Sequence, residues 1–188
     1  NVTNQCNLSC AYCYEYSEDK IVDTTNGTQP KFMSEETARQ SIDLLFAESG
    51  DNQVVHVSFF GGETLMNFPV LSQVVPYART LAAERGKHVE FNLTTNATLL
   101  TSEMIEFLAD HDVAVTVSID GPRELQNKFR VFHDGRGSYD VLLPRVRELL
   151  ARHHSRPIGA RVTLTSQVTD ILSIFRHLTD EIGFQEVG

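Results

Sequence analysis

The sequence contains no cysteine after Cys13, and its three cysteines all lie within eight residues near its beginning. An odd number of cysteines at such a close spacing argues against a disulfide framework. No run of about 18 apolar residues occurs, which argues against a membrane-spanning helix. Basic residues are few, with 16 Lys and Arg against 25 Asp and Glu. The resulting net charge of −9 makes nucleic acid an unexpected partner.

The rest of the composition is that of a soluble globular protein, with 41% hydrophobic and 22% charged residues. A length of 188 residues is enough for one domain with a sizeable core, so we expect residues 1–188 to form a single domain. Residues 1–4 are typical of the end of a strand, and residues 184–187 of the start of another. We therefore expect this domain to lack sequence at both ends.

Cys6, Cys10 and Cys13 follow the spacing C-x3-C-x2-C. Such a dense group of thiolates favours a soft metal or another sulfur chemistry. Three ligands are one fewer than the four that close a structural zinc site, so a zinc ion would need a further ligand such as histidine. Iron–sulfur clusters are also held by cysteine thiolates, and three thiolates on a four-iron cubane would leave one iron open to another ligand.

Apolar periodicity predicts alternating strands and helices along the chain. Ser34 is expected to cap a helix that includes Phe46, and Pro76 is expected to kink or break a helix over 67–85. Residues 17–31 are expected to form an exposed loop. This alternation predicts a parallel α/β sheet covered by helices, but does not separate an open doubly wound sheet from a barrel. The expected strands are 53–60, 88–95, 113–119, 157–165 and the start of one at 184–187, and the other expected helices are 101–110, 138–153 and 168–182.

Unusual polar and glycine-rich motifs follow the predicted strands. Because the C-terminal ends of parallel strands form the active site in α/β folds, we expect these motifs to meet at one mouth. Ser118 should face that mouth, and Asp120 should shape the turn that follows it. The motifs are the cysteine segment, Gly61-Gly62-Glu63, Thr95-Asn96 and Ser118-Ile119-Asp120-Gly121-Pro122.

Three polar residues at this mouth each have a functional and a structural interpretation. Glu63 follows two glycines that allow close backbone approach, so its carboxylate could hold an ammonium group, or it could cap a helix. Asn96 offers a donor and an acceptor to a ribose or carboxylate, or it caps a turn. Arg130 suits bidentate pairing with a carboxylate, or it lies on the surface of a polar loop.

Taken together, the motifs resemble those of the radical S-adenosylmethionine (SAM) enzymes. C-x3-C-x-aromatic-C, with Tyr12 as the aromatic residue, is similar to their cluster motif, and Gly-Gly-Glu to the segment that binds the amino group of SAM. Thr95-Asn96-Ala97-Thr98 resembles the family's T-N-G-T, with Ala97 in place of glycine. Ser-Ile-Asp-Gly-Pro resembles the SPASM-type branch, which modifies peptides and proteins. Arg130 stands at the arginine of that branch's H-D-x-x-R, although Gln126-Asn127 replaces the His-Asp pair.

The resemblance implies a fold and a set of cofactors. The fold would be a partial (β/α)6 TIM-like radical SAM barrel, apparently truncated at both ends and without the cysteine-rich C-terminal auxiliary-cluster region of the SPASM branch. Cys6, Cys10 and Cys13 would hold a 4Fe-4S cluster, and SAM would bind at its open iron. The residues implied to bind SAM are Tyr12, Gly61, Gly62, Glu63, Asn96, Ser118, Asp120 and Arg130, with Leu164 as a further candidate behind the adenine.

The resemblance also implies a reaction, in which SAM is reductively cleaved to a 5′-deoxyadenosyl radical that modifies a peptide or protein side chain. A peptide maturase is the first expectation, and an anaerobic sulfatase maturase that forms formylglycine is the second. A non-catalytic binding domain stapled by a metal is the alternative from another class. The expected partners are a peptide or protein substrate and a one-electron donor such as flavodoxin or ferredoxin, in the cytoplasm. No catalytic side chain is indicated.

Overall fold

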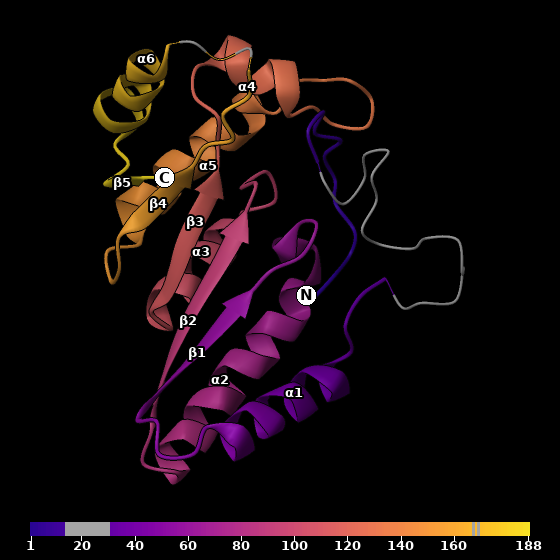
Figure 1. Ribbon diagram of the computed structural model, residues 1–188, viewed down its shortest axis with the longest axis vertical. Coiled ribbons are helices and arrows are strands. Elements are labelled where there is room, and N and C mark those ends of the chain that lie inside the picture. Colours follow the sequence, from indigo (N-terminus) through magenta and orange to yellow (C-terminus); the bar gives the residue numbers. More distant parts are fainter. Residues whose placement is uncertain (14–30, 167, 169) are drawn as a thin grey trace.

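The computed structural model of this chain describes residues 1–13, 31–166, 168 and 170–188 (Figure 1). The predicted loop over 17–31 therefore lies almost entirely outside the described residues. Within the described part, no helix combines the length and the apolar character needed to cross a bilayer.

One parallel sheet organises the described residues. Its strands follow one another in space in the same order as in the sequence, and every pair is parallel. A doubly wound sheet would reverse its strand order at a switch point, so this sequential order is that of a partial barrel and confirms the predicted fold. The strands are β1 (Val54–Phe59), β2 (His88–Thr95), β3 (Val113–Ser118), β4 (Ile158–Arg161) and β5 (Glu186–Val187).

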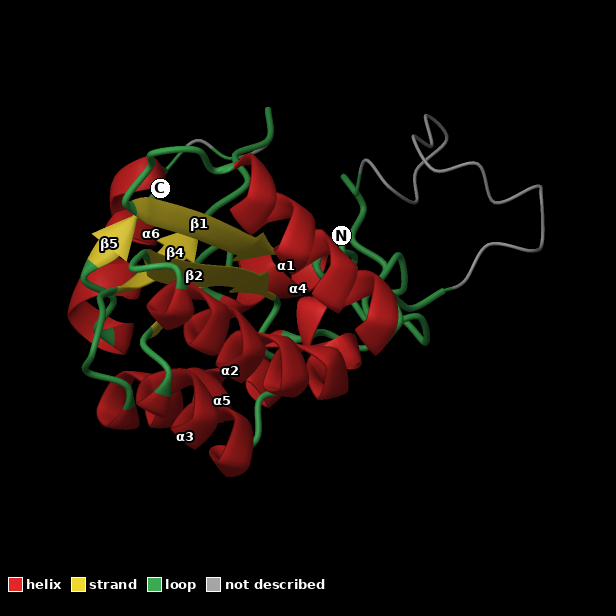
Figure 2. Cartoon of the chain, turned by 90° about the horizontal axis from the view of Figure 1, so that it is seen from below, coloured by secondary structure: helices red, strands yellow, loops and turns green. Residues whose placement is uncertain are grey.

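Helices join the strands, and α2, α3 and α5 lie together on one face of the sheet (Figure 2). The apolar residues of β2 and β3 alternate along each strand, so that Leu93 and Val117 are fully buried in the core. Ser34 caps α1 as predicted, because its hydroxyl accepts a hydrogen bond from the backbone N–H of Thr37. The helices are α1 (Glu35–Glu48), η1 (Thr64–Asn67), α2 (Phe68–Glu84), α3 (Ser102–Asp110), α4 (Arg123–Phe129), α5 (Tyr139–Arg152), α6 (Ile171–Arg176) and η2, a π-helical turn (His177–Ile182).

The structure corrects several predicted elements. Pro76 does not break α2, because buried side chains on both sides of it, such as Val74 and Ala78, hold the helix in the core. Helix α4 was not predicted, since its seven residues carry too few apolar positions to show a period. Strand β4 ends at Arg161 rather than at residue 165. Residues 1–4 form no strand but two isolated bridges at Thr3, to Phe32 and to Gly61.

The N-terminal segment runs beside the end of β1. The Val2 N–H donates to the Phe60 carbonyl at 2.8 Å, and the Gly62 N–H donates to the Thr3 carbonyl at 3.2 Å. A Cβ atom added at Gly61 would lie closer to the Thr3 carbonyl oxygen than van der Waals contact permits. Glycine at this position therefore allows the segment that carries the cysteines to dock on the sheet.

We expect Gly61→Ala to lower the free energy of unfolding by about 1–3 kcal/mol, the usual cost of overpacking, because the added methyl group meets rigid backbone. Chemical denaturation followed by circular dichroism measures this cost. Gly159→Ala is the matched control, because its new Cβ would lie 3.8 Å from its nearest neighbour, the Glu186 Oε2 atom. Equal stability of the two variants would contradict the proposed close docking.

Candidate functional site

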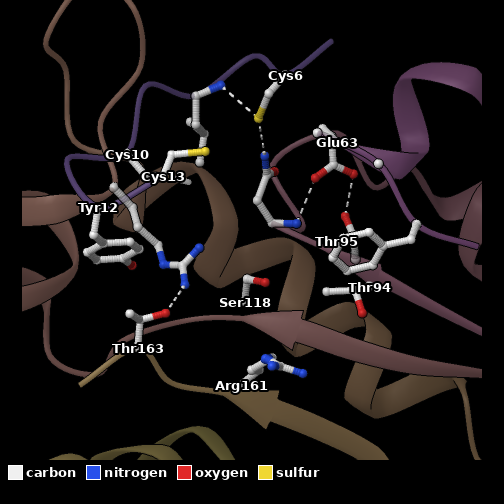
Figure 3. Close-up of a pocket in the computed structure, with 16 residues that line it drawn as sticks. Cys6, Cys10, Tyr12, Cys13, Glu63, Thr94, Thr95, Ser118, Arg161 and Thr163 are labelled. Atoms are coloured by element: carbon white, nitrogen blue, oxygen red, sulfur yellow. Dashed lines mark hydrogen bonds between the residues drawn. The ribbon is translucent and has the colours of Figure 1, made fainter. Parts of the chain in front are cut away.

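A pocket of about 390 Å³ opens at the C-terminal ends of the strands (Figure 3). Figure 3 shows the cysteines on one side of this pocket and Ser118, Arg161 and Thr163 on the other. The four motifs therefore meet at one mouth, as the sequence predicts. Its lining residues are Cys6, Leu8, Cys10, Tyr12, Cys13, Phe60, Gly61, Gly62, Glu63, Thr94, Thr95, Asn96, Ser118, Arg130, Arg161 and Thr163.

All of the predicted site residues except two line this pocket. Asp120 lies behind the wall, where it contacts Tyr12 and Arg130. Leu164, the candidate for the adenine, is exposed and does not line the pocket. Thr95, which belongs to a predicted motif, also lines the pocket. Sequence reasoning missed the other lining side chains, Leu8, Phe60, Thr94, Arg161 and Thr163; their only signal was their position at or just after a strand end, or within the cysteine segment.

The three thiols are half-buried and free. Burial raises the pKa of Cys6 to about 12 and also raises the pKa of Cys10, on which the nearby Arg130 guanidinium acts in the opposite direction. The Cys6 and Cys10 thiols would therefore stay protonated at neutral pH unless a metal supplied positive charge, because a coordinating thiol gives up its proton when it binds the metal. Buried soft donors in a pocket of this size fit an iron–sulfur cluster.

The arrangement of the thiols also fits a cluster better than a single ion. In the described ranges, no three His, Cys, Asp or Glu side chains converge closely enough to hold one metal ion. In a cubane each thiolate binds a different iron, so the cysteine sulfur atoms are placed around the whole cluster and need not converge on a single ion. All three cysteines line the same pocket, as ligands of one cluster must.

The last residue of α4 and the segment after it support the cysteine segment. The Ser9 N–H donates to the Val131 carbonyl at 2.7 Å, and the Ala11 N–H donates to the Phe129 carbonyl at 2.9 Å. The His133 ring Nε2 also lies 3.0 Å from the Cys6 carbonyl oxygen. Residues distant in the sequence thus fix the backbone of the cysteine segment.

Asp120 ties the cysteine segment to the end of β3. Its carboxylate, only 1% exposed, accepts hydrogen bonds from the Tyr12 hydroxyl, from Arg130 Nη2 at 3.1 Å and from the Thr163 N–H at 3.0 Å. Burial raises the pKa of Tyr12, so its phenol keeps the proton that it donates. Arg130 is only 8% exposed, so the interpretation of Arg130 as a surface residue is wrong.

Glu63 joins the ends of β1 and β2. Its carboxylate is 1% exposed and accepts hydrogen bonds from the Leu65 N–H at 3.0 Å, the Thr95 hydroxyl at 2.6 Å and the Asn96 N–H at 2.7 Å. The first of these bonds caps η1, as the structural interpretation requires. Burial raises the pKa of Glu63 despite these donors. Its contact with the amino group of SAM stays a prediction, as do the other SAM contacts.

Comparison with known proteins identifies the family. The profile of the radical SAM superfamily matches residues 1–181, so the chain belongs to this superfamily. Members of the superfamily use a 4Fe-4S cluster and SAM, which are the cofactors expected from the sequence.

Two curated relatives and one solved structure illustrate the likeness. An uncharacterized protein of Methanocaldococcus jannaschii is 34% identical over 100% of this chain and 59% of its own length. The serine-type anaerobic sulfatase-maturating enzyme of Bacteroides thetaiotaomicron is 34% identical over 79% of this chain and 34% of its own length. Native anSMEcpe with bound AdoMet (SAM) superposes with a TM-score of 0.82 over 99% of this chain and 49% of that one; at 20% identity this likeness shows the fold alone. The chain thus spans only about a third to three fifths of the proteins that it matches.

We expect Asp120→Asn to destabilise the protein by about 3–5 kcal/mol, the cost of breaking a buried ion pair, because Arg130 would keep its charge without a counterion. Thermal and chemical denaturation measure the loss. Asp134→Asn is the matched control, because it breaks the exposed pair with Arg136 and should change stability little. A neutral effect of Asp120→Asn would mean that the pair does not hold the mouth together.

Proposed function

We propose that this chain is the catalytic core of a radical SAM enzyme that modifies a peptide or protein side chain. The observation that carries the proposal is the convergence of three half-buried thiols on one pocket with the strand-end motifs Gly61-Gly62-Glu63 and Ser118. A non-catalytic metal staple would need the thiols but no polar groups from distant strand ends. The arrangement therefore favours an enzyme over a metal-stapled binding domain.

The residues of the chain have separate tasks in this proposal. Cys6, Cys10 and Cys13 hold the 4Fe-4S cluster, and the pocket beside them receives SAM. When both groups are bound, they supply the reductive cleavage of SAM to methionine and a 5′-deoxyadenosyl radical. The surrounding walls exclude water from the reactive species. Glu63, which follows β1, and Ser118, at the end of β3, line the same pocket and orient the methionine part of SAM.

A peptide or protein substrate is supported by the relatives. The sulfatase-maturating enzyme of Bacteroides thetaiotaomicron is named for action on a protein, and anSMEcpe has been solved with a bound peptide. A peptide maturase is therefore our first proposal. Formylglycine formation by a sulfatase maturase is the second candidate, favoured by the 34% identity to that relative. A one-electron donor such as flavodoxin or ferredoxin and a cytoplasmic location complete the proposal.

The thiols should act as a unit. After anaerobic reconstitution with iron and sulfide, replacing Cys6, Cys10 or Cys13 with Ala should abolish bound iron and formation of 5′-deoxyadenosine from SAM and dithionite, because two thiolates cannot hold the cubane firmly. Ser9→Ala in the same segment is the control, because the Ser9 side chain is exposed. Near-normal iron content in Cys10→Ala would contradict the proposal that the three cysteines hold a 4Fe-4S cluster. A colourless unaltered protein with tightly bound zinc would contradict it as well.

The second candidate has its own test. The reconstituted chain should be incubated with SAM, dithionite and three sulfatase-derived peptides that carry Ser, Cys or Ala at the same position. Mass spectrometry would detect formylglycine on the Ser or Cys peptide and none on the Ala peptide if the chain is a sulfatase maturase. Production of 5′-deoxyadenosine with all three peptides unmodified would count against this candidate and leave the peptide maturase.

A further inference from the structure

The side chain of Asn96 lies between the end of β2 and the cysteine segment. It is 6% exposed, and its Nδ2 atom lies 3.0 Å from Asn7 Oδ1 and 3.9 Å from the Cys6 sulfur. Both distances satisfy hydrogen bonding, since bonds to sulfur are longer than bonds to oxygen. The two N–H groups of the amide are therefore both used within the protein.

The surroundings of Asn96 fix the orientation of its amide. The Oδ1 atom accepts hydrogen bonds from the Thr98 N–H at 3.0 Å and from the Thr98 hydroxyl at 2.6 Å. A flipped amide would place its NH₂ group against the Thr98 N–H donor and its oxygen against the Cys6 sulfur. The Glu63 carboxylate also holds the backbone N–H of Asn96 at 2.7 Å. The structure thus points one Asn96 N–H at the sulfur of Cys6.

Cys6 has a different environment from Cys10. Its sulfur accepts hydrogen bonds from the Leu8 N–H at 3.4 Å and from Asn96 Nδ2, and both donors are neutral. The Cys10 thiol instead lies close to the Arg130 guanidinium. A hydrogen bond to a cluster sulfur stabilises the more negative, reduced state of the cluster and so raises its reduction potential.

We infer that Asn96 donates a hydrogen bond to the Cys6 thiolate of the bound cluster and thereby raises the cluster's reduction potential. This inference rests on the proposed function, because it requires the cluster at Cys6. Asn96 is then a positioning residue that acts through a cluster ligand. A direct contact from Asn96 to the ribose or carboxylate of SAM would require one of its four side-chain hydrogen bonds to be broken or shared.

The test is a redox titration of the reconstituted protein, followed by electron paramagnetic resonance, without any substrate. Asn96→Leu keeps the size of the side chain and removes its N–H groups, so the midpoint potential should shift to a more negative value. Asn96→Asp keeps an oxygen for Thr98 and also removes the N–H groups, so it should shift the potential in the same direction, and further because of its charge. Asn92→Leu is the matched control, because Asn92 lies on β2, the strand that leads to Asn96, and donates to the Ser58 hydroxyl rather than to sulfur.

The outcomes separate this inference from the proposed function. An unaltered potential in Asn96→Leu, with full iron content, would overturn the inference and leave the proposed function intact. Loss of the cluster from both Asn96 variants would also overturn it, because the amide would then be needed for assembly rather than for tuning. Failure of the unaltered chain to take up iron would instead overturn the proposed function. A shift in the Asn96 variants and none in Asn92→Leu supports the inference.

Discussion

The backbone hydrogen bonds that hold the cysteine segment against the sheet are the constraint on which the whole site depends. This segment belongs to no strand or helix, so its own local structure does not fix the positions of its thiols. The residues just after β1 pair with Val2 and Thr3 on one side, and the end of α4 and the residues after it pair with Ser9 and Ala11 on the other. Because three ligands of one cluster must keep a common geometry, both supports are needed, and each comes from a different part of the fold.

Much of the fold was predictable because its signals are local. Strands β1 to β3 carry alternating or continuous apolar residues, and Ser34 caps α1 by a bond to a residue three positions away. The failures arose where tertiary contacts override local preference. Helix α2 continues through Pro76 because its apolar face packs in the core, although a proline within a helix favours a break. Helix α4 is held by contacts that a seven-residue segment cannot show in its sequence.

The candidate site was predictable as a set of motifs but not as a set of contacts. The position of each motif after a strand was enough to bring the cysteines, Glu63, Asn96 and Ser118 to one pocket. The sequence could not show that the Asn96 amide is enclosed by Asn7 and Cys6 as well as by its neighbour Thr98, because Asn7 and Cys6 come from a distant segment. It also could not decide whether Arg130 is buried, since that depends on its pairing with Asp120.

The positions of the buried charged residues help to distinguish an enzyme from a metal-stapled binding domain. Glu63, Asp120 and Arg130 are the only Asp, Glu, Lys or Arg residues in the described part of the chain that are buried, and all three lie at or directly behind the pocket. Burial of a charge costs free energy that even a good ion pair repays only in part, and apolar side chains of similar size would often be as stable. A chain under selection for stability alone would keep such groups on the surface, as it does with Asp134 and Arg136. Their concentration at the pocket therefore supports the proposal of an enzyme, because an enzyme needs fixed polar groups beside the three thiols and a metal staple does not.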